Sequence, residues 1–226
     1  MKKIIAYTLL LVSSLCIFSC QKEDQQRTSP ELTQIFNEQE LKDIEMLVSV
    51  VEDKLLKNSD TKDIDKAFQL FIKDNLENLP NKFDLFNYEE VEKLYNTIDK
   101  GTFNNIWSYI KGYNFVLKDS TREITMAYER KFMNYIELLG NKDPKLKEYI
   151  NHIKTTGTSS NFLYPPLLTN YNQEKETLEA PTKFGDYNTR VYRAIDIITI
   201  SDIVYHSRIE NKKIREIREK NAEREK

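Results

Sequence analysis

The sequence predicts an all-α protein: an irregular antiparallel array of about seven to eight amphipathic helices, with one long loop and a charged C-terminal helix. Three observations support this class. Glycine is scarce, with five among 226 residues, although β-turns and phosphate-binding loops depend on it. Apolar residues recur at helical spacing along most of the chain. Residue pairs typical of helix starts precede several of these apolar stripes.

The first helices are predicted from capping residues and the apolar stripe that follows them. Pro30 follows Ser29 and suits the first position of a helix, where its missing N–H costs nothing. Asn37 and Glu40 have the spacing of a capping box, in which each side chain bonds the other residue's backbone N–H. Apolar residues then recur at helical spacing over residues 41–55, which predicts one amphipathic helix there.

Two further helices are expected next. Either Asp60 or Thr61 is the expected cap of a helix whose apolar stripe covers residues 64–79. Asn87 and Glu90 repeat the capping-box spacing, and the apolar residues after them predict a helix that ends at Gly101.

The middle of the chain is predicted to continue as helices. Thr102 is the expected cap of a helix over residues 102–117, in which Gly112 is a weak point or kink. Another helix is expected over residues 119–139. The Asp143-Pro144 pair predicts one more helix start.

A long loop and a last helix complete the predicted fold. Residues 158–186 lack helical spacing, and a connection of this length is often functional or disordered. Asp186 is the expected cap of a helix that begins at Tyr187. Residues 195–205 are rich in β-branched side chains, but no convincing second strand exists to pair with them, so helix is predicted. Residues 207–226 mix basic and acidic side chains and are expected to form a solvent-exposed helical tail.

The N-terminus has the pattern of a secretory signal. Two lysines precede an apolar stretch, Ile4–Phe18, that is shorter than the about 20 residues that a bilayer span needs. The segment Ile17-Phe18-Ser19-Cys20 resembles the lipobox of bacterial lipoproteins. This resemblance implies thioether diacylation of Cys20 at its sulfur, cleavage before Cys20, and acylation of the new amino group. Two or three acyl chains would anchor the protein stably in a membrane without spanning it.

The residues after Cys20 predict a location. Gln21, Lys22, Glu23 and Asp24 resemble the short export signal of surface lipoproteins in Bacteroidota-type bacteria. This resemblance implies an outer-membrane lipoprotein displayed on the cell surface, with a periplasm-facing lipoprotein as the open alternative.

The predicted organisation has four parts. They are a signal peptide (1–19), a lipidated cysteine with a flexible tether (20–29), an all-α domain (30–206) and the charged tail (207–226).

Composition excludes several classes of function. Removing residues 1–19 leaves 32 basic and 36 acidic side chains, and this near-balance gives no general attraction to nucleic acid. Cys16 lies in the predicted signal and Cys20 would carry lipid. The mature domain therefore has no thiol for a disulfide, a metal or a nucleophile.

No motif of catalysis or metal binding stands out. The patterns G-x-S-x-G and H-E-x-x-H are absent. The side chains weighed for such roles are Asp84, the Glu89-Glu90 pair, His152, Asp196, Asp202 and His206. Their spacing shows no convergence on a shared site, and charged residues of amphipathic helices mostly face solvent. We therefore expect no catalytic residue, metal or cofactor.

Aromatic residues are the best candidates for a binding role, with 13 Tyr, 11 Phe and 1 Trp. The candidate binding surface consists of Trp107, Tyr109, Tyr113, Phe162, Tyr164 and Tyr171. Tyrosine and tryptophan are favoured at interfaces. The alternative is that such rings fill the core of a glycine-poor helical array, and the helical spacing of Phe103, Trp107 and Ile110 favours this alternative.

Together these features predict a membrane-anchored lipoprotein that acts as a non-catalytic binding or interaction module of the cell envelope. Its expected partners are the membrane, through the lipid anchor, and another envelope protein or a surface polymer. Two alternatives are a hydrolase of envelope polymers that uses Asp or Glu, and an immunity-type lipoprotein that neutralises a toxin.

Overall fold

The computed structural model describes most of the chain after the predicted lipidation region. The described residues are 27–77, 85–144, 146–148, 150–151, 170–172, 177–179 and 186–224. They are mostly helical and end in a long C-terminal helix, so the predicted helical class is confirmed. The predicted signal peptide, Cys20 and the export motif lie outside the described residues.

The elements are named in chain order. They are α2 (Pro30–Ile35), α3 (Glu38–Lys57), α4 (Ile64–Glu77), α5 (Tyr88–Thr97), α6 (Lys100–Ile106), β1 (Trp107–Asn114), β2 (Asp119–Met126), α7 (Lys131–Gly140), β3 (Asn170–Asn172), β4 (Thr177–Glu179) and α9 (Tyr187–Arg224).

Several helices start where capping residues predicted them. Ser29 caps α2, because its Oγ accepts the backbone N–H of Leu32 at 3.1 Å. The Asn37–Glu40 and Asn87–Glu90 pairs form complete capping boxes at α3 and α5. Asp186 holds the start of α9, where its carboxylate accepts a backbone N–H of the first turn at 2.8 Å. Local sequence therefore sets these boundaries.

Two helix starts differ from the prediction. Asp63, rather than the Asp60-Thr61 pair, holds the start of α4, since its Oδ1 accepts two backbone N–H groups of that turn at 2.9 and 3.2 Å. Asp99 caps α6 by accepting the N–H of Gly101 at 2.7 Å. Gly101 consequently lies in the first turn of α6 instead of ending α5.

The largest departure is the β1–β2 hairpin, which stands where helices over residues 102–117 and 119–139 were predicted. Strand β1 begins directly after α6, and the two strands pair antiparallel from Trp107↔Met126 to Asn114↔Asp119. The next helix, α7, begins only at Lys131. Both helix predictions were therefore wrong across this stretch.

The hairpin loop, residues 115–118, closes without glycine. Asn114 Oδ1 accepts the backbone N–H groups of Val116 and Leu117 at 3.0 and 3.1 Å, which is an Asx-type turn. Lys118 then takes the left-handed φ of 52° that glycine usually supplies. The scarcity of glycine thus gave a misleading reason to exclude strands here.

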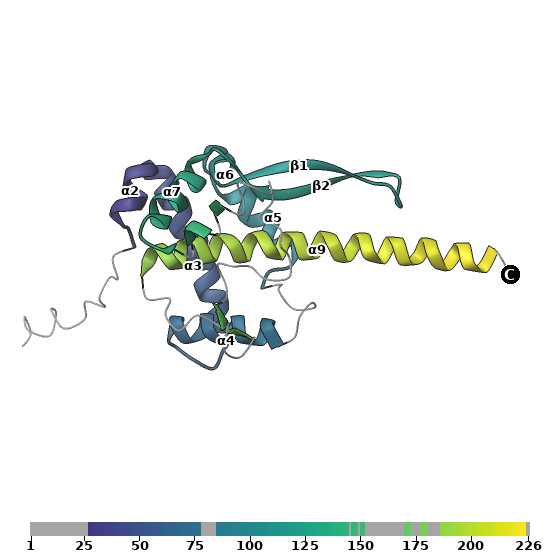
Figure 1. The fold of residues 1–226 in the computed structure, drawn as a ribbon, viewed down its shortest axis with the longest axis horizontal. Helices are drawn as coiled ribbons and strands as arrows, with labels where there is room; N and C mark the ends of the chain where they lie inside the picture. The colour runs from purple at the N-terminus through teal and green to yellow at the C-terminus, as the bar shows by residue number, and fades with distance from the viewer. Residues whose placement is uncertain are drawn as a thin grey trace, which may run out of the picture.

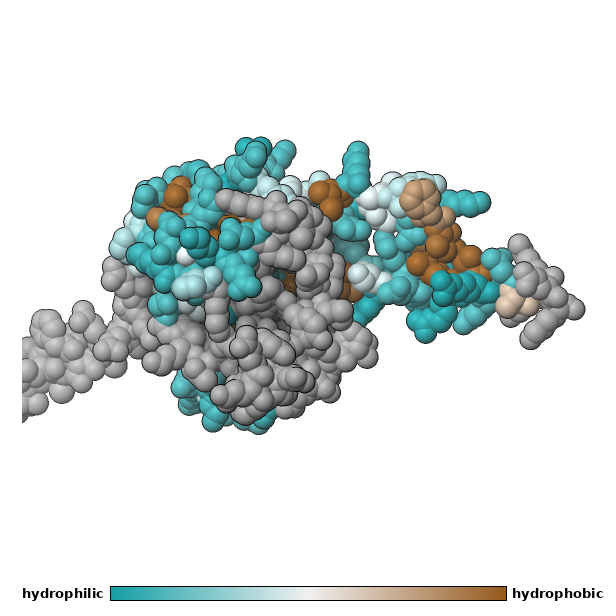
Figure 2. All heavy atoms as spheres, in the orientation of Figure 1, coloured by the Kyte–Doolittle hydropathy of each residue, from teal (hydrophilic) through white to brown (hydrophobic). Residues whose placement is uncertain are grey.

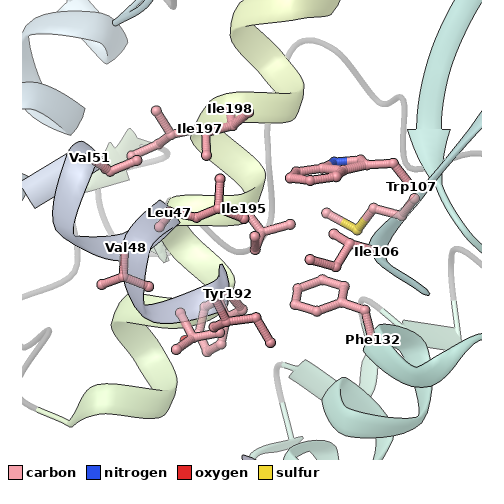
Figure 3. Packing of buried hydrophobic residues seen from close by; sticks show 14 of the residues in the cluster. Leu47, Val48, Val51, Ile106, Trp107, Phe132, Tyr192, Ile195, Ile197 and Ile198 are labelled. Atoms are coloured by element: carbon pink, nitrogen blue, oxygen red, sulfur yellow. The ribbon is translucent and has the colours of Figure 1, made fainter. Parts of the chain in front are cut away.

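The first half of α9 forms the centre of the core. It contacts α3, α5 and β2, and Figure 3 shows Ile195, Ile197 and Ile198 between the valines of α3 and the ring of Trp107. These three isoleucines are at most 1% exposed. A helix that is apolar on several sides is expected to be surrounded by other elements. The helical prediction for residues 195–205 is confirmed.

The predicted long connection, residues 158–186, contains a short antiparallel strand pair. β3 and β4 pair from Asn170↔Glu179 to Asn172↔Thr177, and β4 contacts α4. Before this connection, Asp143 Oδ1 accepts the N–H of Leu146 at 3.3 Å, as the predicted helix start requires.

The hairpin and the second half of α9 project together from the helical body (Figure 1). We define this arm as residues 110–123 of the hairpin and residues 205–224 of α9. Asn114 Nδ2 donates to Glu210 Oε2 at 3.2 Å, which holds the end of the hairpin against the helix. With 38 residues, α9 is about 57 Å long at 1.5 Å per residue. Roughly its second half therefore extends beyond the body.

Candidate binding surface on the projecting arm

The aromatic residues of the predicted binding surface lie in different surroundings. Trp107 is completely buried, and its Nε1–H donates to Thr199 Oγ1 at 2.8 Å, so it fills the core and presents no face to a partner. Phe162 and Tyr164 lie outside the described residues. Tyr171 lies in β3.

The two tyrosines of β1 differ in exposure. Tyr109 is half-buried between the stacked ring of Phe103, at 5.4 Å, and the guanidinium of Arg122, at 3.3 Å from the ring centre. Burial raises the pKa of Tyr109, partly offset by Arg122. Tyr113, further along β1, is 54% exposed and lies on the arm. Among the predicted residues whose side-chain exposure the structure describes, Tyr113 is thus the one that is openly available.

An apolar tip occupies the outer part of the hairpin. It consists of Ile110, Tyr113, Phe115 and Val116, of which Phe115 is 84% exposed. The described residues include one other exposed large hydrophobic side chain, Leu70 of α4. Figure 2 shows brown, hydrophobic atoms gathered at the outer end of the arm. Several exposed large apolar side chains close together in the chain are a common feature of binding surfaces.

The tip is held in place by the loop and by α9. The rings of Tyr113 and Phe115 meet edge to face at 5.1 Å. Asn114 bonds both the loop backbone and Glu210, so the loop is fixed in two directions. At the base of the hairpin, Ile124 and Met126 are buried in the core. The apolar side chains therefore sit on an ordered support that limits the entropy lost on binding.

The arm also differs from the rest of the chain in charge. It holds ten basic and six acidic residues, a net charge of +4. The remainder of the chain holds 24 basic and 30 acidic residues, a net charge of −6. The apolar tip is flanked by Lys111 and Lys118 on the hairpin, and Lys212 and Lys213 follow Glu210 on the helix. The arm thus combines apolar and basic groups on one projection.

A cluster of titratable and aromatic groups lies where α9 leaves the body. We call it the neck cluster: Tyr88, Asp202, Tyr205 and His206. Tyr88 of α5 stacks on Tyr205 at 4.6 Å and meets the ring of His206 at 5.6 Å. His206 Nε2 lies 3.4 Å from Asp202 Oδ1. These contacts fix the direction in which the arm leaves the body.

The carboxyl of Asp202 is the most unusual group of the neck cluster. Burial raises its pKa to about 6, with a further rise from Glu92, while His206 and Arg122 act in the opposite direction. Asp202 is only 3% exposed. A carboxyl that is buried to this extent cannot contact a polymer substrate at the surface. Asp202 therefore has a structural role in the neck cluster.

The other candidate acids are separated in the fold. Burial raises the pKa of Asp196 to about 7, against the charge of Arg193. Glu90 forms an ion pair with Lys54 and belongs to the capping box of α5. Asp84 and His152 lie outside the described residues. Across the part of the chain that the structure describes, no group of three or more His, Cys, Asp or Glu is placed to hold a metal ion.

Phe115 and Val116 were not identified from the sequence as binding residues. One sequence signal was available: aromatic residues stand at positions 107, 109, 113 and 115, which is every second position apart from Lys111, and this is a strand pattern. In a hairpin, residues 115–118 form the loop between the two strands. Apolar residues are unusual in such a loop, because hairpin loops usually carry polar turn residues.

None of the helices in the described segments is long and apolar enough to cross a membrane. A scan against family models and searches of curated proteins and solved structures found no match to this chain.

Proposed function

We propose that this protein is a membrane-anchored lipoprotein that acts as a non-catalytic interaction module of the cell envelope and binds through its arm. The observation that supports the binding role is the apolar tip on the hairpin, headed by Phe115 at 84% exposure. The predicted lipobox at Cys20 supports the anchored location.

Exposure of the apolar tip to water costs free energy. Burial of the tip against a partner would recover this free energy. Burying a Phe or Val side chain contributes about 1.5–3 kcal/mol each. Phe115, which is the most exposed of the large hydrophobic side chains on the described surface, therefore offers the largest gain, and Val116 beside it adds to this gain. An arm that is charged around its apolar tip stays soluble while it presents that tip.

Affinity capture tests the binding role. A tagged, lipidated chain is recovered from membranes with whatever protein, polymer or lipid it holds, and is compared with Phe115→Ser/Val116→Ser. We expect the captured material to be lost from the tip variant and kept by Leu70→Ser, which removes an exposed apolar side chain from α4. Equal capture by all three chains would contradict binding through the arm.

Two experiments test the anchored location. After a high-salt wash that removes peripheral proteins, we expect wild type in the membrane fraction and Cys20→Ala in the soluble fraction. Retention of Cys20→Ala would contradict the anchor. Protease treatment of intact cells tests surface display: cleavage is expected, and full protection while a known surface protein is cut would indicate a periplasm-facing lipoprotein.

A further inference from the structure

We propose that the apolar tip inserts into the headgroup region of a bilayer that contains anionic lipid, with the basic residues of the arm lying on its surface. This inference rests on the proposed binding role of the arm and names the partner that the tip contacts. The shape of the tip, the charge around it and the small area that it presents support a lipid partner.

The shape of the tip suits entry into a bilayer. It lies on a hairpin that ends in a four-residue loop, 115–118, and it projects beside α9 at a distance from the body (Figure 1). Phe115 and Val116 lead the loop, at 84% and 49% exposed. Aromatic and aliphatic side chains on a projection can enter the boundary of headgroups and acyl chains while the rest of the protein stays in water.

The charge around the tip suits an anionic surface. Lys111 and Lys118 flank the apolar residues of the hairpin. Lys212 and Lys213 lie just beyond Glu210, the residue that holds the end of the hairpin. Basic residues near an anionic leaflet are attracted by its negative surface potential. Because the arm is net positive and the remainder net negative, an anionic surface would attract the arm end and repel the body.

The size of the tip favours a lipid over a protein partner. A standard protein interface buries about 800 Å² on each side and uses about 20–30 residues. The apolar tip supplies four exposed side chains, which are Ile110, Tyr113, Phe115 and Val116. Lipid insertion needs no matching pocket, since acyl chains adapt to any apolar side chain. A few inserted residues with a basic rim are therefore sufficient.

Vesicle binding tests this inference. The mature chain, residues 20–226 with Cys20→Ser, keeps every described residue and lacks the lipid. It is sedimented with vesicles of phosphatidylcholine and phosphatidylglycerol, and with vesicles of phosphatidylcholine alone. We expect binding to the anionic vesicles only, weakened by added salt. Phe115→Ser/Val116→Ser should reduce it by about tenfold or more, while the control Leu70→Ser binds as wild type.

A fluorescent probe gives a second readout. Phe115→Trp places an indole at the tip, and the native Trp107 is buried and unaffected by the surface. Insertion should shift the emission of Phe115→Trp to shorter wavelength on anionic vesicles, with no shift in wild type. Lys212→Gln/Lys213→Gln should weaken binding without abolishing the shift at saturating lipid.

Absence of binding to anionic vesicles, or binding that the tip substitutions leave unchanged, would overturn the lipid inference. The proposed function fails differently, because it requires tip-dependent capture of any material. Tip-dependent capture of a protein or polymer, without vesicle binding, would therefore reject the lipid partner and leave the interaction module in place.

Discussion

At the scale of single residues, the core of this protein depends on buried charges as well as apolar contacts. Arg190 of α9 and Glu52 of α3 form an ion pair at 3.2 Å, and both residues are 8% exposed. Burial raises the pKa of Glu52, although Arg190 and Arg27 oppose this rise. The pair joins the two helices that contribute most to the core. Removing one of its charges should therefore destabilise the fold, because the other charge would stay buried without its partner.

The first prediction concerns this pair. Glu52→Met leaves the Arg190 charge in the core and should lower the free energy of unfolding by about 3–5 kcal/mol. The double variant Glu52→Met/Arg190→Met removes both charges and should be more stable than the single variant. Urea unfolding followed by circular dichroism measures both. The second single variant, Arg190→Met, completes the cycle, and a double variant whose loss equals the sum of the two single losses would contradict the coupling.

The second prediction is a pH dependence from Asp202. Its pKa is raised from 3.8 to about 6, so the folded state holds the proton more tightly than the unfolded state. The stabilisation is complete below about pH 4 and is lost as the pH rises through 6. Asp202→Asn escapes this loss and should be more stable than wild type at pH 8, by on the order of 1–2 kcal/mol.

Urea unfolding at pH 8 and at pH 4.5 checks this prediction, because the advantage of Asp202→Asn should shrink at the lower pH. The lost contact with His206 is a small correction, since that histidine is 39% exposed at its side chain. Glu216→Gln, on the exposed part of α9, is the control and should show no pH-dependent gain. An advantage of Asp202→Asn that is equal at both pH values would count against the buried carboxyl as its cause.

At the scale of elements, the sequence predicted helices wherever a cap and an apolar stripe occur together. The capping boxes of Asn37–Glu40 and Asn87–Glu90 are local, and so the starts of α3 and α5 follow from neighbouring residues alone. Helix α9 was also predicted, from Asp186 onward. These elements need little information from the rest of the fold.

The hairpin could not be predicted in the same way. Its strands are eight residues each, and short apolar runs fit helix and strand spacing almost equally well. What decides between them is the packing of Ile124 and Met126 against α9, which is a tertiary contact. The candidate site shared this problem: Tyr113 was identified as an aromatic residue, whereas Phe115 becomes notable only once it lies on a loop.

The third prediction concerns closure of that loop. Lys118 has a left-handed φ of 52°, which costs a non-glycine residue about 1–2 kcal/mol. Lys118→Gly removes this strain but adds flexibility to the unfolded chain. The free energy of opening the hairpin should therefore change by less than about 1 kcal/mol. Lys118→Val should weaken it, because a β-branched residue rarely adopts positive φ.

Hydrogen exchange of the β1 and β2 amides measures these changes. Faster exchange is expected for Lys118→Val than for Lys118→Gly. Lys111→Val is the control, because an exposed strand position accepts a β-branched residue readily. Similar exchange rates in all three variants would show that the loop conformation does not determine the stability of the hairpin.

At the scale of the whole molecule, one continuous helix joins the body to the arm. Ser29, at the start of the described chain, donates to Asn188 Oδ1 at 2.5 Å, so the predicted tether leaves the molecule beside the N-terminal end of α9. Glu210, beside the tip, lies about 33 Å further along that helix at 1.5 Å per residue. The start of the described chain and the proposed tip thus lie at opposite ends of this stretch of α9.

This separation is compatible with contact at both ends. The tether from Cys20 to Ser29 can extend to about 30 Å at 3.3–3.6 Å per residue, so a tilted molecule can rest its tip on the leaflet that holds its lipid. A stable anchor would strengthen a weaker attachment through the tip, because it raises the local concentration of the tip at the same surface. The anchor and the arm would then act as one bivalent attachment.

The fourth prediction separates the body from the end of the arm. A chain that ends at Asn211 keeps the bond between Asn114 and Glu210 and loses residues whose described side chains are mostly exposed. Because surface residues contribute little to folding, the free energy of unfolding should change by less than about 0.5 kcal/mol. Trp107 fluorescence measures this change independently of the lost helical signal, since Trp107 lies in the core. A large loss would show that the body depends on the end of α9, and the arm would then be part of the folding unit instead of a projection from it.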